Sequence, residues 1–225
     1  MDARLKAAAG LVPRCGCVAD IGADHALLSI YLVKMGIARR VIAADVKKLP
    51  LETGRLNVLE EGVADSVELR LSFGFENFKP GEFDAAVIAG MGGETIAEIL
   101  QSAPFRLDMP LVLQPMTRCD RLLSFLNAEG LSVKRHIAAP SAGRIYHVLR
   151  VERGGVAGCD PLFEIVGGLD LTEPNAFKLM DKKLKVLRST AESLKNIEGK
   201  RAEYLHVSEL CRLLGERLAS VKTQI

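Results

Sequence analysis

Short apolar runs alternate with amphipathic segments over residues 1–130 of the chain. The runs carry few charges, which is typical of strands buried on both faces of a parallel sheet. The segments between them repeat apolar residues every three or four positions, as amphipathic helices do. Alternating strands and helices predict a doubly wound α/β fold with right-handed crossovers. We predict strands at 17–21, 40–45, 67–71, 84–89 and 110–114, and helices at 2–10, 25–36, 48–61, 93–102 and 118–129.

The pattern changes after Gly130. Two extended runs, 131–139 and 143–151, flank the turn-forming sequence PSAG and predict an antiparallel hairpin. A parallel sheet that ends in such a hairpin is similar to the seven-stranded, Rossmann-like sheet of class I methyltransferases. Dehydrogenases of the doubly wound class usually lack this hairpin, so the pattern favours the methyltransferase arrangement by analogy of fold.

Glycine and proline are frequent between residues 152 and 170 and predict a connector between two domains. We place the sheet domain at 1–155 and a second domain at 156–225. In the second domain apolar residues recur at helical spacing on both sides of Gly199. This pattern predicts a coiled-coil-like hairpin of two helices that cover each other's apolar stripes.

Composition places the chain among globular proteins, with 48% hydrophobic residues in 225. Apolar stretches are interrupted well before the roughly eighteen residues of a membrane span, and the first residues lack an apolar signal region. We therefore expect a cytoplasmic protein without membrane contact. The five cysteines are odd in number and lack CxxC spacing, so the sequence suggests neither a disulfide framework nor a zinc site.

The charge is distributed unevenly along the chain. Residues 1–171 carry 19 Lys/Arg against 21 Asp/Glu, a net charge of −2, whereas residues 172–225 carry 11 against 7, a net charge of +4. A basic tail indicates an anionic partner such as a nucleic acid, although a solvated helical face gives the same counts.

A turn with acidic side chains follows the first predicted strand. The segment 18–26 reads VADIGADHA, and the second predicted strand ends at Asp45. A carboxylate at that exit is how a doubly wound sheet holds an adenosine ribose. Only Gly22 occupies a glycine position of the dinucleotide fingerprint, and Asp24 would repel a pyrophosphate. We therefore predict that the cofactor is S-adenosylmethionine, whose amino acid and sulfonium are cationic, and not NAD.

Each carboxylate of this region also has a purely structural interpretation. Asp20 either faces the methionine ammonium or caps the following helix, and Asp24 either contacts the cofactor or is the N-cap of helix 25–36. His25, in the first helical turn, either contacts the ligand or is simply solvated. Asp45 either accepts the ribose hydroxyls or merely ends its strand; Val46 follows it as a further cofactor contact.

The segment 89–93 reads AGMGG and lies where class I methyltransferases carry out methyl transfer. Glycines around Met91 let the backbone approach a ligand closely, although a tight turn with no ligand would use them equally. Gln114 ends the fifth predicted strand and has the donor and acceptor needed to bind a base edge. Ser72 or Phe73, after the third strand, is expected beside the adenine.

Three motifs together carry a family resemblance: DIGADHA at 20–26, AGMGG at 89–93 and LQP at 113–115. With the basic two-helix tail, they resemble the bacterial tRNA adenine-22 N1-methyltransferase family (TrmK) over essentially the whole chain. The resemblance implies S-adenosylmethionine as donor, N1 of adenine 22 in the D-loop region of tRNA as acceptor, and a helical domain that helps grip the RNA. Adenine N1 already offers a lone pair, so positioning and not a strong base should dominate the rate.

The chain departs from the family pattern at two places. An aromatic residue and a proline often follow Asp-His-Ala, where this chain has Leu27, Leu28 and Ser29. An asparagine often follows Gln-Pro, where this chain has Met116, which cannot supply the same hydrogen bond. The departures bear on the exact target more than on the family.

The expected site residues form three groups, and no metal is expected. The catalytic group is Asp24, His25, Gly90, Gly92 and Gln114. The cofactor-binding group is Asp20, Gly22, Asp24, Asp45, Val46, Ser72, Phe73, Gly90 and Met91. The group expected to contact RNA phosphates is Arg4, Lys6, Arg14, Lys182, Lys183, Lys185, Arg188, Lys200 and Arg201.

The expected partner is tRNA, and the expected state is a monomer or a weak homodimer. Two other classes stay open on the residues alone. One is a methyltransferase acting on a small molecule or a protein, with the helical tail as a dimerisation element. The other is a non-catalytic nucleotide-binding protein. A nicotinamide oxidoreductase fits worst because the first loop is acidic and lacks glycines.

Overall fold

The computed structural model describes residues 1–154 and 160–223. The chain divides into two compact units, Met1–Ala157 and Gly158–Ile225, each of which is described by itself. The domain boundary that we predicted between residues 155 and 156 lies outside the described residues.

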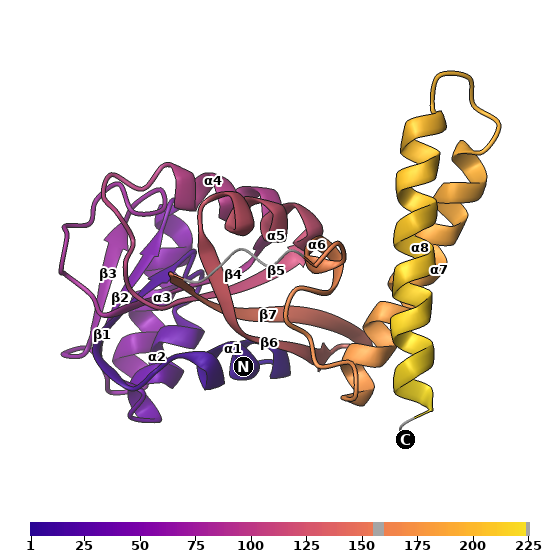
Figure 1. Ribbon diagram of the computed structural model, residues 1–225. Helices are drawn as coiled ribbons and strands as arrows, with labels where there is room; N and C mark the ends of the chain where they lie inside the picture. Colours follow the sequence, from indigo (N-terminus) through magenta and orange to yellow (C-terminus); the bar gives the residue numbers. More distant parts are fainter. Residues whose placement is uncertain (155–159, 224–225) are drawn as a thin grey trace. The chain divides into compact units, whose positions relative to one another are not determined.

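Within the described part of the first unit, seven strands form one sheet in the order β3-β2-β1-β4-β5-β7-β6 (Figure 1). The first five strands in the chain run parallel, and β7 pairs antiparallel with both β5 and β6. This is the predicted doubly wound sheet finished by a hairpin. The strands are β1 (Cys15–Ile21), β2 (Ala38–Asp45), β3 (Val67–Leu71), β4 (Ala85–Gly92), β5 (Leu111–Thr117), β6 (Leu131–Ser141) and β7 (Arg144–Arg153).

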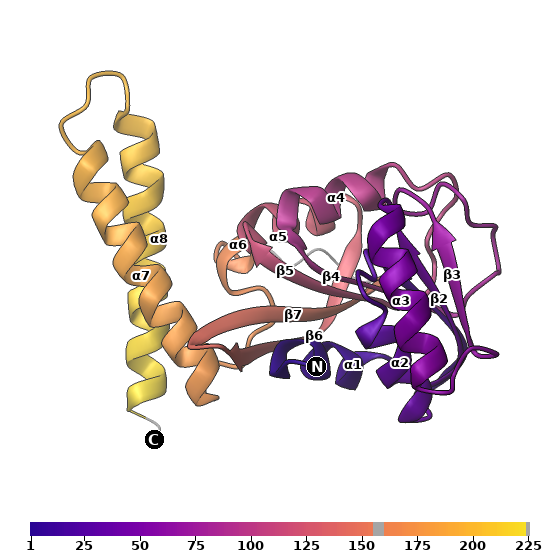
Figure 2. The same ribbon diagram turned by 180° about the vertical axis from the view of Figure 1, so that it is seen from behind.

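Helices cover both faces of the sheet. One face carries α1 (Ala3–Leu11), α2 (Leu27–Lys34) and α3 (Lys48–Glu60), and the other carries α4 (Gly93–Gln101) and α5 (Cys119–Ala128) (Figures 1 and 2). The central strands are therefore buried on both sides, and Val18, Val41 and Val87 have no exposed surface. The predicted apolar character of these strands follows from this burial.

The structure corrects the predicted start of the second helix. Asp24 and Ala26 adopt positive φ values of 47° and 58°, so the chain turns through residues 24–26 and α2 begins only at Leu27. Ala26, not Asp24, is the N-cap, and no side chain caps this helix. Asp24 is thus not a helix cap, and His25 lies in the turn before the helix and not in its first turn.

The fourth strand is also longer than predicted. It runs to Gly92 through register shifts at Met91, so Gly90 and Met91 belong to a bulged strand and not to a loop. The helix α4 starts directly at Gly93. A Cβ on Gly93 would lie 2.2 Å from the Arg118 carbonyl oxygen, so this glycine lets two backbones meet.

The second unit holds the predicted helical hairpin. The helices α7 (Pro174–Leu194) and α8 (Arg201–Lys222) lie side by side (Figures 1 and 2) and bury Met180 and Leu184 of α7 and Leu214 and Leu218 of α8. A short helix, α6 (Phe163–Val166), precedes them in the segment predicted as a connector.

Ion pairing ties the start of this unit to α8. Arg217 donates to both carboxylate oxygens of Asp160, at 2.7 and 3.1 Å. The Arg217 hydrogen bonds hold the pKa of Asp160 below its usual value.

Among the described residues, no helix combines the length and the apolar character that a membrane crossing requires.

Candidate active site

A cavity of about 430 Å³ opens at the carboxyl ends of β1, β2 and β4. Adjacent carboxyl ends are where ligands bind in open α/β sheets. The cavity brings together eight of the predicted catalytic and cofactor-binding residues. They are Asp20, Gly22, Asp24, His25, Asp45, Val46, Gly90 and Met91.

Asp20 is the buried carboxyl of the cavity, with 2% of its surface exposed. The Ser29 hydroxyl donates to its Oδ2 at 2.6 Å. Burial and, to a smaller extent, the nearby Asp45 carboxylate raise the pKa of Asp20 to about 6 against the opposing Ser29 hydrogen bonds. The sequence analysis noted Ser29 only as a departure from the family pattern; the signal of its role is a polar residue on the buried face of an apolar helix.

Asp45 anchors the first loop to the second strand. Its Oδ2 accepts from the Asp24 backbone amide at 3.2 Å, and its Oδ1 accepts from the Lys47 amide at 2.8 Å. Each carboxylate oxygen has a second lone pair for a ligand hydroxyl. The carboxylate therefore stands fixed at the strand exit that a ribose would occupy.

Gly22, directly after β1, and Met91 of β4 meet in the lining of the cavity. Gly22 has a φ of +72°, and a Cβ there would lie 1.9 Å from the Met91 Cε. The glycine thus allows both the left-handed turn and the close approach of Met91. The predicted glycine turn and glycine cluster meet at this point.

His25 faces the cavity with an unsatisfied nitrogen. Among the described residues its Nδ1 is a buried side-chain atom without a hydrogen-bond partner. The other nitrogen, Nε2, lies 3.7 Å from Asp24 Oδ1. A buried imidazole nitrogen without a partner is costly unless a ligand or water binds it.

Arg4 and Gln114 are bonded to each other next to Gly90 of β4. The Gln114 Oε1 accepts from the Gly90 amide at 3.1 Å and from the Arg4 guanidinium, and its Nε2 donates to the Pro115 carbonyl at 2.9 Å. Gln114 is fully buried, and the Arg4 side chain is only 13% exposed. Arg4, which we predicted to contact RNA phosphates, lines the cavity. Gln114 does not line it, and its Oε1 holds the Gly90 amide in place.

Four predicted residues lie away from the cavity lining within the described chain: Gln114, described above, and Ser72, Phe73 and Gly92. Ser72 is buried, and its hydroxyl donates to the Gly74 carbonyl and accepts from the Asn77 amide, which makes it a turn residue. Phe73 is 40% exposed next to it. Gly92 ends β4 beside Thr117.

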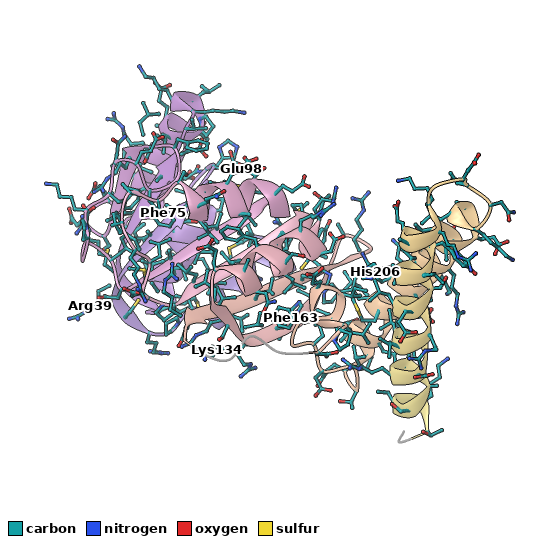
Figure 3. The ribbon with its side chains drawn as sticks, turned by 45° about the horizontal axis from the view of Figure 1, so that its top comes forward. Arg39, Phe75, Glu98, Lys134, Phe163 and His206 are labelled. Atoms are coloured by element: carbon teal, nitrogen blue, oxygen red, sulfur yellow. The ribbon has the colours of Figure 1, made fainter. Side chains whose placement is uncertain are left out.

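Phe75, labelled in Figure 3, anchors this loop instead. Its ring is 1% exposed and lies 5.8 Å from the Phe78 ring and 5.7 Å from the Phe83 ring, measured between centroids. The loop is thus fixed by an aromatic cluster, and no side chain of this loop lines the cavity.

The residues predicted to contact RNA are mostly exposed and concentrate on one helix. Within its bounds α7 carries five Lys/Arg against two Asp/Glu, whereas α8 carries four against three. Lys182, Lys185 and Arg188 of α7 are exposed. Lys6, Arg14, Lys200 and Arg201 are also exposed, and Lys183 is half-buried.

The chain is similar to known proteins in sequence and in structure. The family described as "Methyltransferase domain" matches residues 1–149. The tRNA (adenine(22)-N(1))-methyltransferase of Bacillus subtilis is 33% identical over 156 residues, which span 68% of this chain and 66% of that protein, just under two thirds of its length.

Solved structures match more of the chain. The crystal structure of the B. subtilis m1A22 tRNA methyltransferase TrmK is 27% identical, with a TM-score of 0.80 over 98% of both chains. A Streptococcus pneumoniae protein, Sp1610, crystallised in complex with S-adenosyl-L-methionine, is 27% identical, with a TM-score of 0.80 over 96% of this chain and 98% of its own.

Proposed function

The chain belongs to the methyltransferase domain family, and on this premise we propose that it transfers the methyl group of S-adenosylmethionine to N1 of adenine 22 in tRNA. The observation that carries the proposal is the cavity at the carboxyl ends of β1, β2 and β4, where Asp20, Asp24 and Asp45 meet. Support for the acceptor comes from a curated relative of this name that matches 68% of the chain, and from a solved structure of this name that matches 98% of it.

The residues of the cavity fit this cofactor by charge and by shape. The cavity lining holds three carboxylates against the cationic side chains of Arg4 and Lys47, and this acidic excess favours a cationic ligand over a diphosphate. Asp45 would hold the ribose hydroxyls, and Asp20 would face the methionine ammonium. His25 lines the same cavity and would lie beside a bound molecule.

The chemistry asks little of the protein beyond placement. S-adenosylmethionine supplies an electrophilic methyl group when it is bound. Adenine N1 presents a lone pair in the neutral base, so no general base has to remove a proton before the attack. The backbone at Gly90, held by Gln114 Oε1 and packed near Arg4, would align the base and exclude water.

The product base is a cation, and the first loop is acidic. Asp24 and His25 line the cavity on one side, with His25 Nε2 3.7 Å from Asp24 Oδ1. We assign these two residues to stabilising the positive charge that develops on the adenine. Because N1 lies on the Watson–Crick edge, the target base must be unpaired and turned out of its stack to reach this cavity.

The tail supplies the second requirement, a grip on the RNA backbone. The excess of basic side chains on α7 supports phosphate contacts from Lys182, Lys185 and Arg188. The mutual burial of the apolar stripes of α7 and α8 supports a monomer or a weak homodimer. A tRNA substrate would place the protein in the cytoplasm.

One experiment tests the reaction and the position together. Purified full-length protein is incubated with an unmodified tRNA transcript and labelled methyl donor, and the digested nucleosides are identified by mass spectrometry. We expect 1-methyladenosine, and a reverse-transcription stop at position 22, because the methyl group blocks the Watson–Crick edge.

The matched control is the same transcript with guanine at position 22, which should accept no methyl group. Methyl transfer to another nucleoside or to another adenine would contradict the proposed target. An absence of transfer with several adenine-22 transcripts, although the cofactor binds in calorimetry, would contradict the tRNA proposal and favour a small-molecule or protein acceptor.

A further inference from the structure

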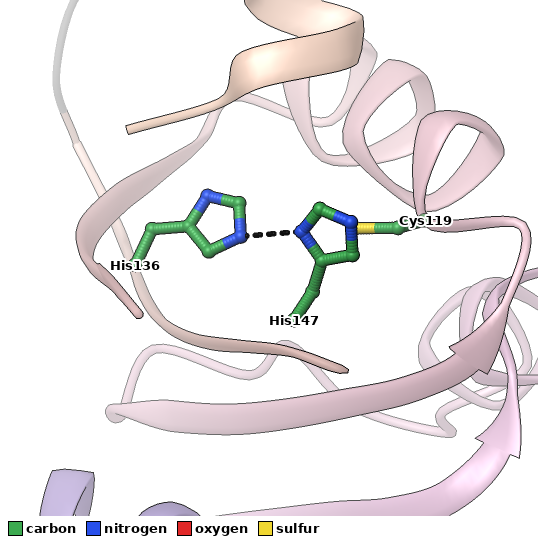
Figure 4. A group of neighbouring side chains, drawn as sticks. All are labelled: Cys119, His136 and His147. Carbon is green, nitrogen blue, oxygen red and sulfur yellow. Dashed lines mark hydrogen bonds between the residues drawn. The ribbon is translucent and has the colours of Figure 1, made fainter. Parts of the chain in front are cut away.

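Three metal-ligating side chains meet away from the cavity, in the first unit. Cys119, the first residue of α5, lies beside His136 of β6 and His147 of β7 (Figure 4). One ligand atom from each residue lies within 4.8 Å of the other two. His136 Nε2 and His147 Nδ1 are 2.9 Å apart and share a hydrogen bond.

The fold itself brings these residues together from distant positions in the sequence. In the β6–β7 hairpin, His136 pairs with Leu149 and Ala138 pairs with His147, so the two imidazoles are diagonal neighbours on one face. Cys119 and His136 are 9% and 6% exposed, and His147 is half-buried. Such burial shields the three side chains from competition by bulk water.

The donor atoms determine the class of metal. Cys119 is the first residue of α5, and a cysteine that binds a metal ion does so as the thiolate. A thiolate and two neutral imidazoles form a borderline-soft donor set. This set suits Zn²⁺ and does not suit Mg²⁺ or Ca²⁺, which take oxygen ligands.

We propose that Cys119, His136 and His147 bind one Zn²⁺ ion and leave its fourth position open to water. Tetrahedral Zn²⁺ with bonds of about 2.0–2.3 Å sets its ligand atoms roughly 3.3–3.8 Å apart. The two imidazole nitrogens are 2.9 Å apart and all three ligand atoms lie within 4.8 Å of one another, so side-chain rotations would bring them to these separations. The sequence analysis expected no metal because the five cysteines lack CxxC spacing. The fold brings Cys119 of α5 to the two histidines of the β6–β7 hairpin.

The protons of the site balance on binding. The ion replaces the hydrogen bond between the two rings, and the proton shared there moves to the other nitrogen of its imidazole. A Cys119 thiol loses its proton to solvent when its sulfur binds the metal. About one proton is therefore released for each ion bound, and the oxidation state of the metal does not change.

The ion joins the start of α5 to the β6–β7 hairpin. Cys119 follows the end of β5, two residues after Thr117, so the site fixes the segment that leaves this strand. None of the three residues lines the cavity of the candidate active site. We therefore infer that the ion takes no part in methyl transfer and that its binding raises the thermal stability of the first unit.

Cobalt provides a spectroscopic test on the full-length protein. The protein is freed of metal with a chelator and titrated with Co²⁺, which reports thiolate ligation through a near-ultraviolet charge-transfer band and tetrahedral geometry through visible bands. We expect saturation at one Co²⁺ per chain, displacement by Zn²⁺, release of about one proton, and a higher melting temperature with Zn²⁺.

Matched cysteine variants locate the site. Cys119→Ser should lose the charge-transfer band, and His147→Asn should weaken Co²⁺ binding at least tenfold. Cys211→Ser in α8 and Cys17→Ser in β1 should leave the spectrum unchanged. Circular dichroism checks that each variant is folded.

Two measurements on the wild-type chain need no variant. Elemental analysis after metal loading and desalting should find one zinc per chain, and Zn²⁺ should slow alkylation of Cys119, read by peptide mass spectrometry. The proposal is overturned if the metal-free protein shows no thiolate band with Co²⁺ and no change in Cys119 alkylation with Zn²⁺. It is equally overturned if the band survives in Cys119→Ser and disappears in Cys17→Ser.

Discussion

At the scale of single residues, the cavity keeps a carboxyl group where it is least stable. Asp20 is almost fully buried, and its pKa is raised to about 6 from its usual 3.8, chiefly because burial disfavours the charged form. A hydrocarbon side chain would fit the surrounding core better. Retaining a carboxyl at this depth is the pattern of a site that trades stability for ligand binding.

The sign of the pH dependence follows from this shift. Between about pH 4 and pH 6 the folded state holds the Asp20 proton that the unfolded state releases, so the free energy of unfolding falls as the pH rises. The loss amounts to about 3 kcal/mol by pH 7. Asp20→Asn cannot ionise, and it keeps an acceptor for the Ser29 hydroxyl.

We predict that Asp20→Asn gains stability relative to the wild type as the pH rises from 4 to 7, by up to about 3 kcal/mol. Urea unfolding at several pH values measures the difference. The control is Ser29→Ala, which keeps Asp20 but removes the hydrogen bond that favours the ionised carboxyl. In this variant the fall of the free energy of unfolding should extend to higher pH than in the wild type. A stability difference that is constant over this range would contradict the assignment.

The sequence predicted most residues of the cavity but few of the side chains that hold them in place. The residue types at positions 20–26 and Asp45 predicted a nucleoside pocket, because charge and strand order determine that chemistry. The Ser29 hydroxyl, the buried Arg4 guanidinium and the bonding of Gln114 depend on which side chains face each other across elements. Such pairings are set by packing and leave no periodic trace in one sequence.

At the scale of elements, the order of strands and helices was predictable, and several of their ends were not. The fold class and the family resemblance are confirmed. The predicted start of α2 was wrong because two residues other than glycine, Asp24 and Ala26, adopt the left-handed conformation that favours glycine. The predicted end of β4 was wrong because the strand continues through its glycines with a bulge.

The junction between β4 and α4 gives a sharp prediction. A methyl group on Gly93 would meet the Arg118 carbonyl oxygen at 2.2 Å and the carbonyl carbon at 2.8 Å, and backbone cannot rotate away as a side chain can. We expect Gly93→Ala to destabilise the fold by more than about 2 kcal/mol in urea unfolding.

The control for that substitution is Gly10→Ala in α1. A Cβ there meets nothing within 4 Å, and alanine loses less conformational entropy in a helix, so we expect a gain of about 0.5–1 kcal/mol. If both substitutions changed stability alike, close approach of the two backbones at Gly93 would be excluded as the reason for its glycine.

At the scale of the whole molecule, the two units carry two different kinds of electrostatics. The cavity lies within the first unit and is acidic, whereas the basic excess lies on α7 of the second unit. Buried or partly buried charges are screened little by salt, but contacts between surface lysines and phosphates are screened strongly. Binding of the cofactor and binding of tRNA should therefore respond differently to ionic strength.

This difference predicts the behaviour of a single lysine on α7. Lys182→Gln should weaken tRNA binding and lower the slope of log K against log salt by about one, while leaving cofactor affinity unchanged. The matched control is Arg212→Gln on α8, because Arg212 is bound to Glu209 and Glu216 at 2.6 and 2.7 Å and has little charge to offer a phosphate. Filter binding from 50 to 300 mM KCl measures both slopes, because the Debye length falls by more than half over this range. Equal slopes for the two variants would remove α7 as the phosphate-binding helix, since each substitution removes one positive charge.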